Sequence, residues 1–153
     1  MYYLGIAVDA SKREVRFVGL PAADPAAMPE LRTLTYGEDD LPTRMRDLHA
    51  ATCSTLGELP AIAAAVRRMD PPPPRQSAAV RTATIDRLLA EGAVLAAVRD
   101  KTENVVHLTG NEAASRLGFS TKDDALDAAK QFLAGHKQVK KWAEATMVAQ
   151  TLV

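Results

Sequence analysis

Short apolar runs separated by polar turns open the chain, and this pattern predicts three β-strands. Residues 2–9 and 14–20 are rich in β-branched and aromatic side chains, and the polar segment 10–13 between them has the length of a tight turn. Residues 31–36 alternate as a half-buried strand does, and residues 37–40 are predicted to form a turn. We therefore expect an antiparallel hairpin followed by a third strand in a meander.

The next segment changes to a helical period and then returns to a strand. Apolar residues recur at helical spacing from Leu41 onward, and Gly57 is the predicted end of this helix. Residues 59–66 are apolar and bounded by prolines, which favours a buried fourth strand, although their alanines would also suit a helix. Prolines dominate residues 70–76, and proline joins neither a helix interior nor a strand ladder. We expect an extended surface loop there, with Pro71–Pro74 at its centre.

Helical patterns dominate the second half of the chain. Residues 77–100 are predicted to form the longest helix, residues 104–108 a fifth strand, and residues 112–117, 123–133 and 140–152 three further helices. The predicted apolar stripe of the longest helix consists of Val80, Thr84, Leu88, Val94, Leu95 and Val98. The order β-β-β-α-β-α-β-α-α-α predicts a single α/β domain over residues 1–153, with a mixed five-stranded sheet and helices on both faces.

Composition narrows the functional classes. The chain has 153 residues, enough for one domain with a hydrophobic core, and its 19 Lys and Arg balance its 19 Asp and Glu. A net charge of zero excludes a global basic field, so any nucleic-acid surface must be a local patch. An aromatic content of 5% argues against a stacking platform for bases. Because Asp9 interrupts the first apolar run, we expect no signal peptide, and no apolar run reaches the ~18 residues of a membrane span.

Cysteine and histidine offer little candidate chemistry in the sequence. The single cysteine, Cys53, excludes an internal disulfide and a Cys-based metal cluster, which fits a reducing, cytoplasmic location. Cys53 lies on a predicted helix with no evident base, so we do not expect it to be a nucleophile. His49, His107 and His136 are scattered without ligand spacing, and we expect structural or surface roles for them.

Asp9 is the most informative polar residue, because it closes the first apolar strand. A carboxylate at the end of a buried strand costs free energy unless it is solvated, paired or bound to a metal. Asp9 is therefore either a functional acid at the mouth of the sheet or a turn-forming residue that caps the hairpin. Glu91, in the longest predicted helix, presents a similar choice between pointing toward such an acid cluster and being a solvated helix residue.

Four segments together resemble the ribonuclease H fold, and more narrowly the RuvC-like Holliday junction resolvases and their transposase relatives. Residues 4–12, Leu-Gly-Ile-Ala-Val-Asp-Ala-Ser-Lys, are similar to the first-strand motif in which a catalytic Asp precedes a small residue and Ser-Lys. Residues 59–68 lie where the family has its fourth strand. Residues 88–97 resemble the central helix that packs across the sheet, and residues 142–149 resemble the terminal helix that carries the last acid. The joint order implies a ribonuclease H-like domain over nearly the whole chain.

The resemblance implies a nuclease site of three or four carboxylates around two divalent metals, Mg²⁺ or Mn²⁺, which lie roughly 4 Å apart and activate water. Asp9 matches the first carboxylate and Glu144 lies near the last, so both are candidate catalytic and metal-binding residues. Arg67 stands where the family has its fourth-strand Glu, and Lys141 stands three residues before Glu144. Asp70 would replace the missing acid only if a bulge or another register brought it back. We therefore expect a degenerate member with weak or lost phosphodiester hydrolysis.

Basic residues near the proline loop are candidates for nucleic-acid contact, because in the resolvases this region of the fold faces DNA. The candidates are Arg67, Arg68, Arg75 and Arg81, with Lys137 and Lys141 in a second cluster; otherwise they form a solvated rim. The expected partner is branched or other structured nucleic acid, and the resemblance implies a homodimer. The alternative is a small α/β protein–protein interaction module with no nucleic-acid role, whose dimer seam would use Ala125, Ala128 and Ala129.

Overall fold

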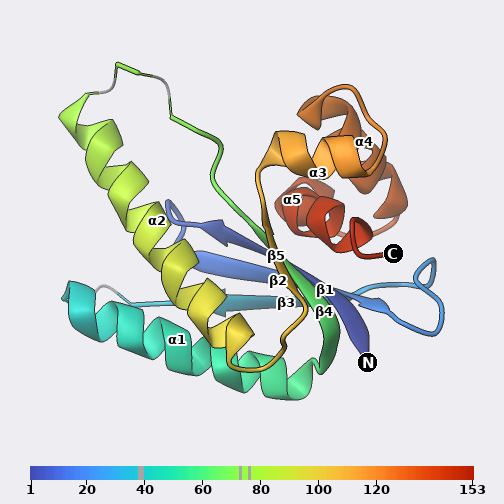
Figure 1. The fold of residues 1–153 in the computed structure, drawn as a ribbon, viewed down its shortest axis with the longest axis horizontal. Helices are drawn as coiled ribbons and strands as arrows, with labels where there is room; N and C mark the ends of the chain where they lie inside the picture. Colours follow the sequence, from blue (N-terminus) through green and yellow to red (C-terminus); the bar gives the residue numbers. More distant parts are fainter. Residues whose placement is uncertain (38–39, 73, 76) are drawn as a thin grey trace.

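The computed structural model describes residues 1–37, 40–72, 74–75 and 77–153, which are built around a five-stranded sheet in the order β3-β2-β1-β4-β5 (Figure 1). The first three strands form the predicted antiparallel meander, and the last two run parallel to the first. The strands are β1 (Tyr2–Asp9), β2 (Glu14–Pro21), β3 (Glu30–Thr35), β4 (Ala61–Arg67) and β5 (Val105–Leu108). The prediction of a mixed five-stranded sheet is confirmed.

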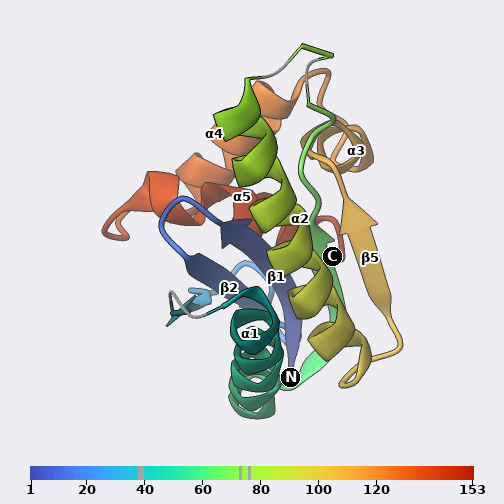
Figure 2. The ribbon, with the colours of Figure 1, turned by 90° about the vertical axis from the view of Figure 1, so that its left-hand side faces the viewer.

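Helices cover both faces of this sheet, as predicted (Figures 1 and 2). One face is covered by α1 (Leu41–Glu58) and α2 (Ala78–Arg99), which also pack against each other. The other face is covered by α5 (Val139–Gln150), and α3 (Gly110–Arg116) and α4 (Lys122–Phe132) pack around it. The chain therefore forms three layers, with the sheet in the middle.

Alternation along β1 divides the core between these two faces. Leu4, Ile6 and Val8 are buried against α1 and α2, whereas Ala7 is buried against α5. Gly5 also faces α5, and a Cβ atom at this position would lie 2.7 Å from the backbone nitrogen of Ala149 and would collide with the carbonyl oxygen of Ala145. A glycine is thus required for α5 to approach the sheet this closely.

Side-chain caps begin the helices where the sequence places Asp, Ser or Thr. Asp40 caps α1, and Ser77 caps α2 by accepting a hydrogen bond from the backbone of Val80. Thr109 and Glu112 form a reciprocal capping box at α3. The capping box explains why α3 begins at Gly110, directly after β5 and two residues before the predicted start.

The predicted apolar stripe of the longest helix is only half correct. Val94 and Val98 are buried, but Val80 and Leu88 are each 48% exposed. The first turns of α2 project beyond the sheet, as Figure 1 shows, so only the half from Ala90 onward meets the core. A helical period predicts which face of a helix is apolar, but it does not predict how much of the helix the sheet reaches.

Three smaller expectations are also corrected or left open. Gly57 does not end α1, which continues to Glu58 and closes on Leu59. Ala125 and Ala129 do not offer a dimer seam, because both are fully buried against the chain's own α5. The predicted turn at 37–40 and the proline loop include residues 38, 39, 73 and 76, which lie outside the described residues. Among the described residues, no helix has the length and apolarity needed to cross a bilayer.

Candidate functional site

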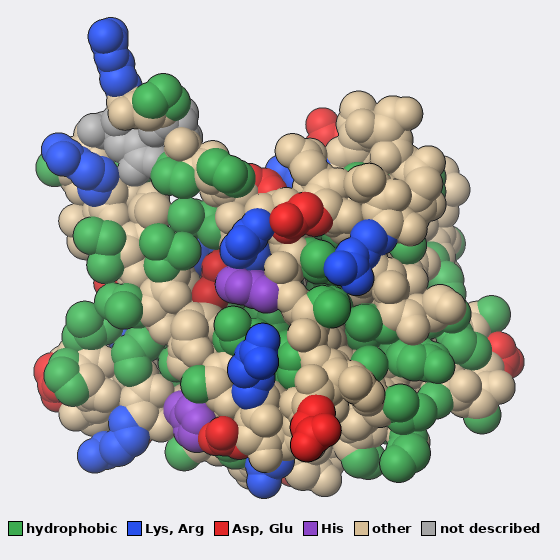
Figure 3. All heavy atoms as spheres, viewed as in Figure 1, with side chains coloured by type: hydrophobic (Ala, Val, Ile, Leu, Met, Phe, Trp, Pro, Cys, Tyr) green, Lys and Arg blue, Asp and Glu red, His purple; other side chains and the backbone are tan. Residues whose placement is uncertain are grey.

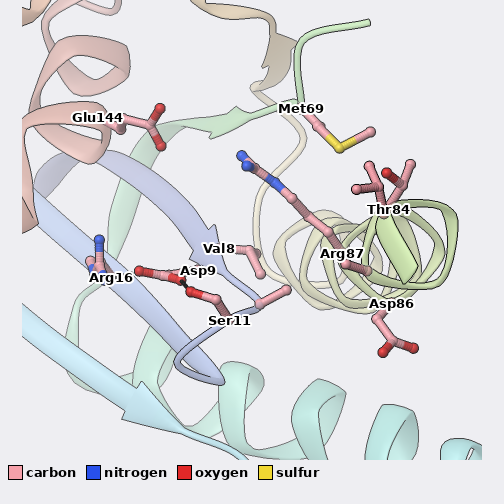
Figure 4. A pocket seen from close by; sticks show the side chains of 12 residues that line it. Val8, Asp9, Ser11, Arg16, Met69, Thr84, Asp86, Arg87 and Glu144 are labelled. Carbon is pink, nitrogen blue, oxygen red and sulfur yellow. Dashed lines mark hydrogen bonds and ion pairs between the residues drawn. The ribbon is translucent and has the colours of Figure 1, made fainter. Parts of the chain in front are cut away.

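The sheet and two helices enclose a cleft of about 510 Å³ at the carboxyl end of β1 (Figure 4). Because β1 and β4 are parallel neighbours, both strands end on this side of the sheet. α2 supplies one wall and α5 contributes Glu144. The lining residues that carry the argument below are Asp9, Ser11, Arg16, Met69, Arg87 and Glu144.

Asp9 enters this cleft already engaged by the chain. Its Oδ1 accepts a hydrogen bond from the hydroxyl of Ser11 at 2.6 Å and a longer one from the backbone of Lys12 at 3.3 Å. Its Oδ2 forms an ion pair with Arg16. Partial burial works to raise the pKa of Asp9, but the Ser11 hydrogen bond and the Arg16 charge outweigh it, so the pKa is lowered. Asp9 thus braces the hairpin turn, as one of the two interpretations predicts, and it also lines the cleft. Its role as a functional acid stays a prediction.

Arg16, on β2, links Asp9 to further charged and polar groups of β2 and α5. Glu14 lies directly opposite Asp9 in the hairpin register and accepts from Arg16 at 3.2 Å. Arg16 also donates to the backbone carbonyl of Lys141 at 3.0 Å, and the Lys141 ammonium lies 3.3 Å from Glu14. Lys141, predicted to contact nucleic acid, is therefore paired inside the protein with its side chain 21% exposed.

Arg67, the last residue of β4, is the largest fully buried side chain among the described residues. Its Nη2 donates to Oδ2 of Asp70 at 2.7 Å and lies 3.7 Å from Oε1 of Glu144. Its Nη1 donates to the backbone carbonyl of Arg68. With 1% of its surface exposed, Arg67 has no face that a phosphate could reach, so we leave it out of the candidate nucleic-acid interface.

Asp70 ties the end of β4 to the helices on the far side of the sheet. Its Oδ1 accepts from the backbone nitrogen of Gly110 at 2.9 Å, and its Oδ2 accepts from Lys122 at 3.0 Å as well as from Arg67. Desolvation works to raise the pKa of Asp70, but these donors outweigh it and lower the pKa to about 2. Both oxygens of the candidate third acid are thus committed to protein donors.

Glu144 has fewer protein contacts than Asp9 or Asp70. It reaches the cleft from α5, whereas Asp9 reaches it from β1 (Figure 4). Its side chain is 36% exposed, and the Arg67 guanidinium at 3.7 Å is its ion-pair partner among the described residues. The lysine neighbours at 140 and 141 do not pair with it among those residues. Of the three candidate acids Asp9, Asp70 and Glu144, Glu144 is therefore the most accessible to a ligand.

Arg87 lines the cleft, and Glu91 is its buried ion-pair partner one turn further along α2. Glu91 is 1% exposed, so it is not a solvated helix residue; it accepts from Arg87 at 2.8 Å and from the backbone of Met69 at 3.0 Å. Arg87 points from α2 into the cleft, as Figure 4 shows, and its Nη2 has no hydrogen-bond partner among the described residues. The i,i+4 spacing was a visible signal for the pair, but nothing in the sequence marked Glu91 as buried.

The remaining candidate basic residues lie at the surface. Arg75, Arg81 and Lys137 are exposed, and Figure 3 shows basic side chains at the projecting end of α2. Arg68 is 44% exposed and donates to both carboxylate oxygens of Glu112 at 3.0 and 3.1 Å. Arg75 and Arg81 follow the end of β4 in the chain, and Arg81 comes directly after Val80, which lines the cleft.

Comparison with known proteins identifies the fold. No protein-family model matches the chain, and no curated protein matches it. Solved structures do: Thermus thermophilus RuvC matches with a TM-score of 0.63, 18% identity, and coverage of 97% of this chain and 90% of that chain. The chain has a RuvC-like fold.

Two further structures agree with this RuvC-like fold. T. thermophilus RuvC in complex with a Holliday junction substrate matches with a TM-score of 0.66 and 17% identity, over 97% of this chain and 89% of that chain. The yeast mitochondrial Holliday junction resolvase Ydc2 matches with a TM-score of 0.58 and 13% identity, over 97% and 75%. The predicted resemblance in fold is thus confirmed.

The donor set of this RuvC-like cleft does not fit a centre of two Mg²⁺ or Mn²⁺ ions. Such ions require several oxygen ligands that are free of other cations. Asp9 is paired with Arg16, and Asp70 with Arg67 and Lys122, while Arg67 also lies beside Glu144. Three carboxylates therefore face three basic groups of the protein itself.

Proposed function

We propose that this protein binds branched or other structured nucleic acid through its RuvC-like fold and hydrolyses phosphodiester bonds weakly or not at all. The observation that carries the proposal is that Arg16 pairs with Asp9, and Arg67 pairs with both Glu144 and Asp70, so all three candidate acids have a guanidinium partner. The nucleic-acid part is supported by two proteins that share the fold: T. thermophilus RuvC, which binds a Holliday junction substrate, and Ydc2, which is a Holliday junction resolvase.

Charge balance supports the loss of hydrolysis. Asp9, Asp70 and Glu144 carry three negative charges, and Arg16, Arg67 and Lys122 carry three positive ones, so the group sums to zero. Two divalent ions would add four positive charges to a group that is already neutral, which Coulomb repulsion opposes. Any residual activity would depend on Mg²⁺ or Mn²⁺ held by Asp9 and Glu144, after Arg16 and Arg67 had moved aside.

Exposed cations support nucleic-acid contact. Arg75 and Arg81 are exposed, and Arg87 lines the cleft, although its Nη2 is itself buried and has no hydrogen-bond partner among the described residues. Lys137 and Arg68 are further exposed basic residues. Phosphate contacts by such residues do not need a net positive protein, because the attraction is local.

We also propose that the protein acts as a homodimer through the projecting half of α2. Ile85, Leu88 and Leu89 are large apolar residues of this helix that do not line the cleft, and they are between 38% and 55% exposed. A second copy related by a two-fold axis would cover them and would place two clefts on one assembly, which suits the symmetry of a four-way junction. Sedimentation of the wild type and of Leu88→Glu tests this: the wild type should be a dimer and the variant a monomer of unchanged helicity. A monomeric wild type would refute it.

The decisive experiment measures binding and cleavage of a labelled four-way junction, with a linear duplex of the same sequences for comparison. We expect salt-sensitive binding that favours the junction, and no junction-specific cleavage with Mn²⁺. No binding at low salt would reject the proposal and favour a protein–protein interaction module. Cleavage that Asp9→Asn abolishes would show that the arginines do not inactivate the site.

Charge reversal tests the proposed surface. The double variant Arg75→Glu/Arg81→Glu should weaken binding and reduce the slope of log affinity against log salt by about 1 for each phosphate that the variant no longer neutralises. Arg46→Glu is the matched control, since Arg46 is 74% exposed on α1 and does not line the cleft. Because the control reverses one charge and the test variant reverses two, an equal weakening of binding per reversed charge would indicate a general charge effect instead of a defined interface.

A further inference from the structure

A second cluster of reactive side chains lies where α1 meets the far end of α2. His49 and Cys53 are one turn apart on α1, and Asp100 is the residue that caps the carboxyl end of α2. Asp100 lies 13 residues beyond Arg87, which corresponds to about 20 Å along a helix axis, and none of the three residues lines the cleft. The cluster is therefore a separate site on the RuvC-like scaffold.

The three side chains are already close together. His49 Nε2 lies 3.0 Å from Oδ2 of Asp100, and His49 Nδ1 lies 3.9 Å from Sγ of Cys53. One potential ligand atom from each residue lies within 4.8 Å of the others. Tetrahedral zinc, with bonds of about 2.0–2.3 Å, separates its ligand atoms by about 3.4–3.6 Å. The potential ligand atoms therefore lie at most about 1.4 Å farther apart than tetrahedral zinc requires.

We propose that His49, Cys53 and Asp100 bind a zinc-class divalent ion that links α1 to α2. The combination of one sulfur, one imidazole nitrogen and one carboxylate oxygen suits Zn²⁺ or Co²⁺ and does not suit Mg²⁺, which prefers oxygen alone. Three protein ligands leave a fourth position for water.

The surroundings of the cluster favour access and rigidity. The side chains of His49 and Asp100 are 37% and 62% exposed, and Cys53 is partly buried, so an ion can enter without unfolding. His49 and Cys53 are held by the middle of an 18-residue helix, and the backbone nitrogen of Asp100 is fixed by a hydrogen bond to Ala96. Ligands on two packed helices are oriented before the ion arrives, which reduces the entropy that binding costs.

The sequence did not predict this site, because Asp100 is far from His49 and Cys53 in the chain. The spacing from His49 to Cys53 places both on one helix face, but a pair of side chains alone predicts no metal. Asp100 joins them only because α1 and α2 pack side by side.

Titration of the reduced, full-length protein with Co²⁺ tests the proposal directly. We expect a thiolate-to-cobalt charge-transfer band that saturates at one equivalent and disappears when Zn²⁺ is added. Cys53→Ala should lose the band, and Asp100→Asn should weaken Co²⁺ affinity about 10- to 100-fold. His136→Ala and Asp127→Asn are controls that remove a histidine or a carboxylate elsewhere, and both should keep the band.

Protection of the thiol gives an independent readout that needs no variant. Zn²⁺ should slow alkylation of Cys53 by iodoacetamide and raise the thermal midpoint of the wild type. His49→Ala should show neither effect while retaining the wild-type far-ultraviolet spectrum. Absence of the cobalt band in the wild type, or Zn²⁺ effects that persist in His49→Ala, would overturn the proposal.

Discussion

Arg67 at the end of β4 and Glu144 on α5 form an ion pair, with 3.7 Å between Nη2 and Oε1. The same guanidinium donates to Asp70 at 2.7 Å. A cation that is built into the chain thus joins two carboxylates that would otherwise repel each other. We infer that Arg67 performs structurally the neutralisation that a metal ion performs in a carboxylate cluster.

Replacing Arg67 by a neutral side chain should destabilise the protein strongly. In Arg67→Met, Asp70 and Glu144 lose their shared cation and the buried hydrogen bonds of the guanidinium, so we expect a loss of about 3 kcal/mol in the free energy of unfolding. Arg68→Met is the matched control, because its side chain is 44% exposed and its ion pair with Glu112 should contribute less than about 1 kcal/mol. Chemical denaturation of the two variants measures the difference; similar losses would show that Arg67 has no special role.

Replacing Arg67 by an acid should create a dependence on metal. In Arg67→Glu, a third carboxylate joins Asp70 and Glu144, so the folded state without metal should be destabilised by like-charge repulsion. Mn²⁺ should then raise the thermal midpoint of Arg67→Glu but leave the wild type unchanged. A thermal scan with Mn²⁺ and with a chelator checks this, and Arg68→Glu controls for charge alone. An equal Mn²⁺ effect on the wild type would mean that the added carboxylate is not what makes stability depend on the metal.

The fold was predictable from the order of strand and helix patterns along the sequence, but the candidate site was predictable only in part. Strand alternation and helical periods identified every strand and helix, because both report which faces are buried. The antiparallel hairpin of residues 2–9 and 14–20 was also predicted, and it is confirmed. The partners of Asp70 were not predictable, because Gly110 and Lys122 belong to α3 and α4, which follow β5 in the chain and are 40 or more residues away from Asp70. Such contacts depend on how elements that are distant in the chain pack together, and local sequence patterns carry no information about that packing.

Gly5 should tolerate no side chain. Gly5→Ala places a Cβ against the backbone of α5 at Ala145 and Ala149, so the helix must move away from β1. We expect a loss of more than about 3 kcal/mol, or failure to fold, since overpacking against backbone cannot be relieved by a rotamer change. Gly92→Ala is the opposite case: its Cβ would meet nothing within 4 Å, and the change should stabilise α2 by about 0.5–1 kcal/mol. Thermal unfolding distinguishes the two, and a neutral Gly5→Ala would contradict the close packing of α5.

Glu91 should hold the cleft wall in place. Glu91→Ala removes the acceptor for Arg87 and for the backbone nitrogen of Met69, so we expect a loss of about 2–3 kcal/mol. Hydrogen exchange at Met69 should also accelerate, because its amide would be left without its present partner. Glu58→Ala is a suitable control, as Glu58 is exposed at the end of α1. Unchanged exchange at Met69 would show that another group holds the loop after β4.

Asp70 should make stability fall in acid. Its pKa is about 2 in the folded protein and 3.8 as a free side chain, so the folded state favours the ionised form. The stabilisation is therefore complete above about pH 4 and is lost as the pH falls toward 2. Solvent screens this partly exposed carboxylate, so we expect it to contribute about 1–2 kcal/mol. The stability difference between wild type and Asp70→Asn, measured by urea unfolding from neutral pH to pH 2, should shrink across that window. A constant difference would mean that the Gly110, Lys122 and Arg67 donors do not favour the ionised carboxylate.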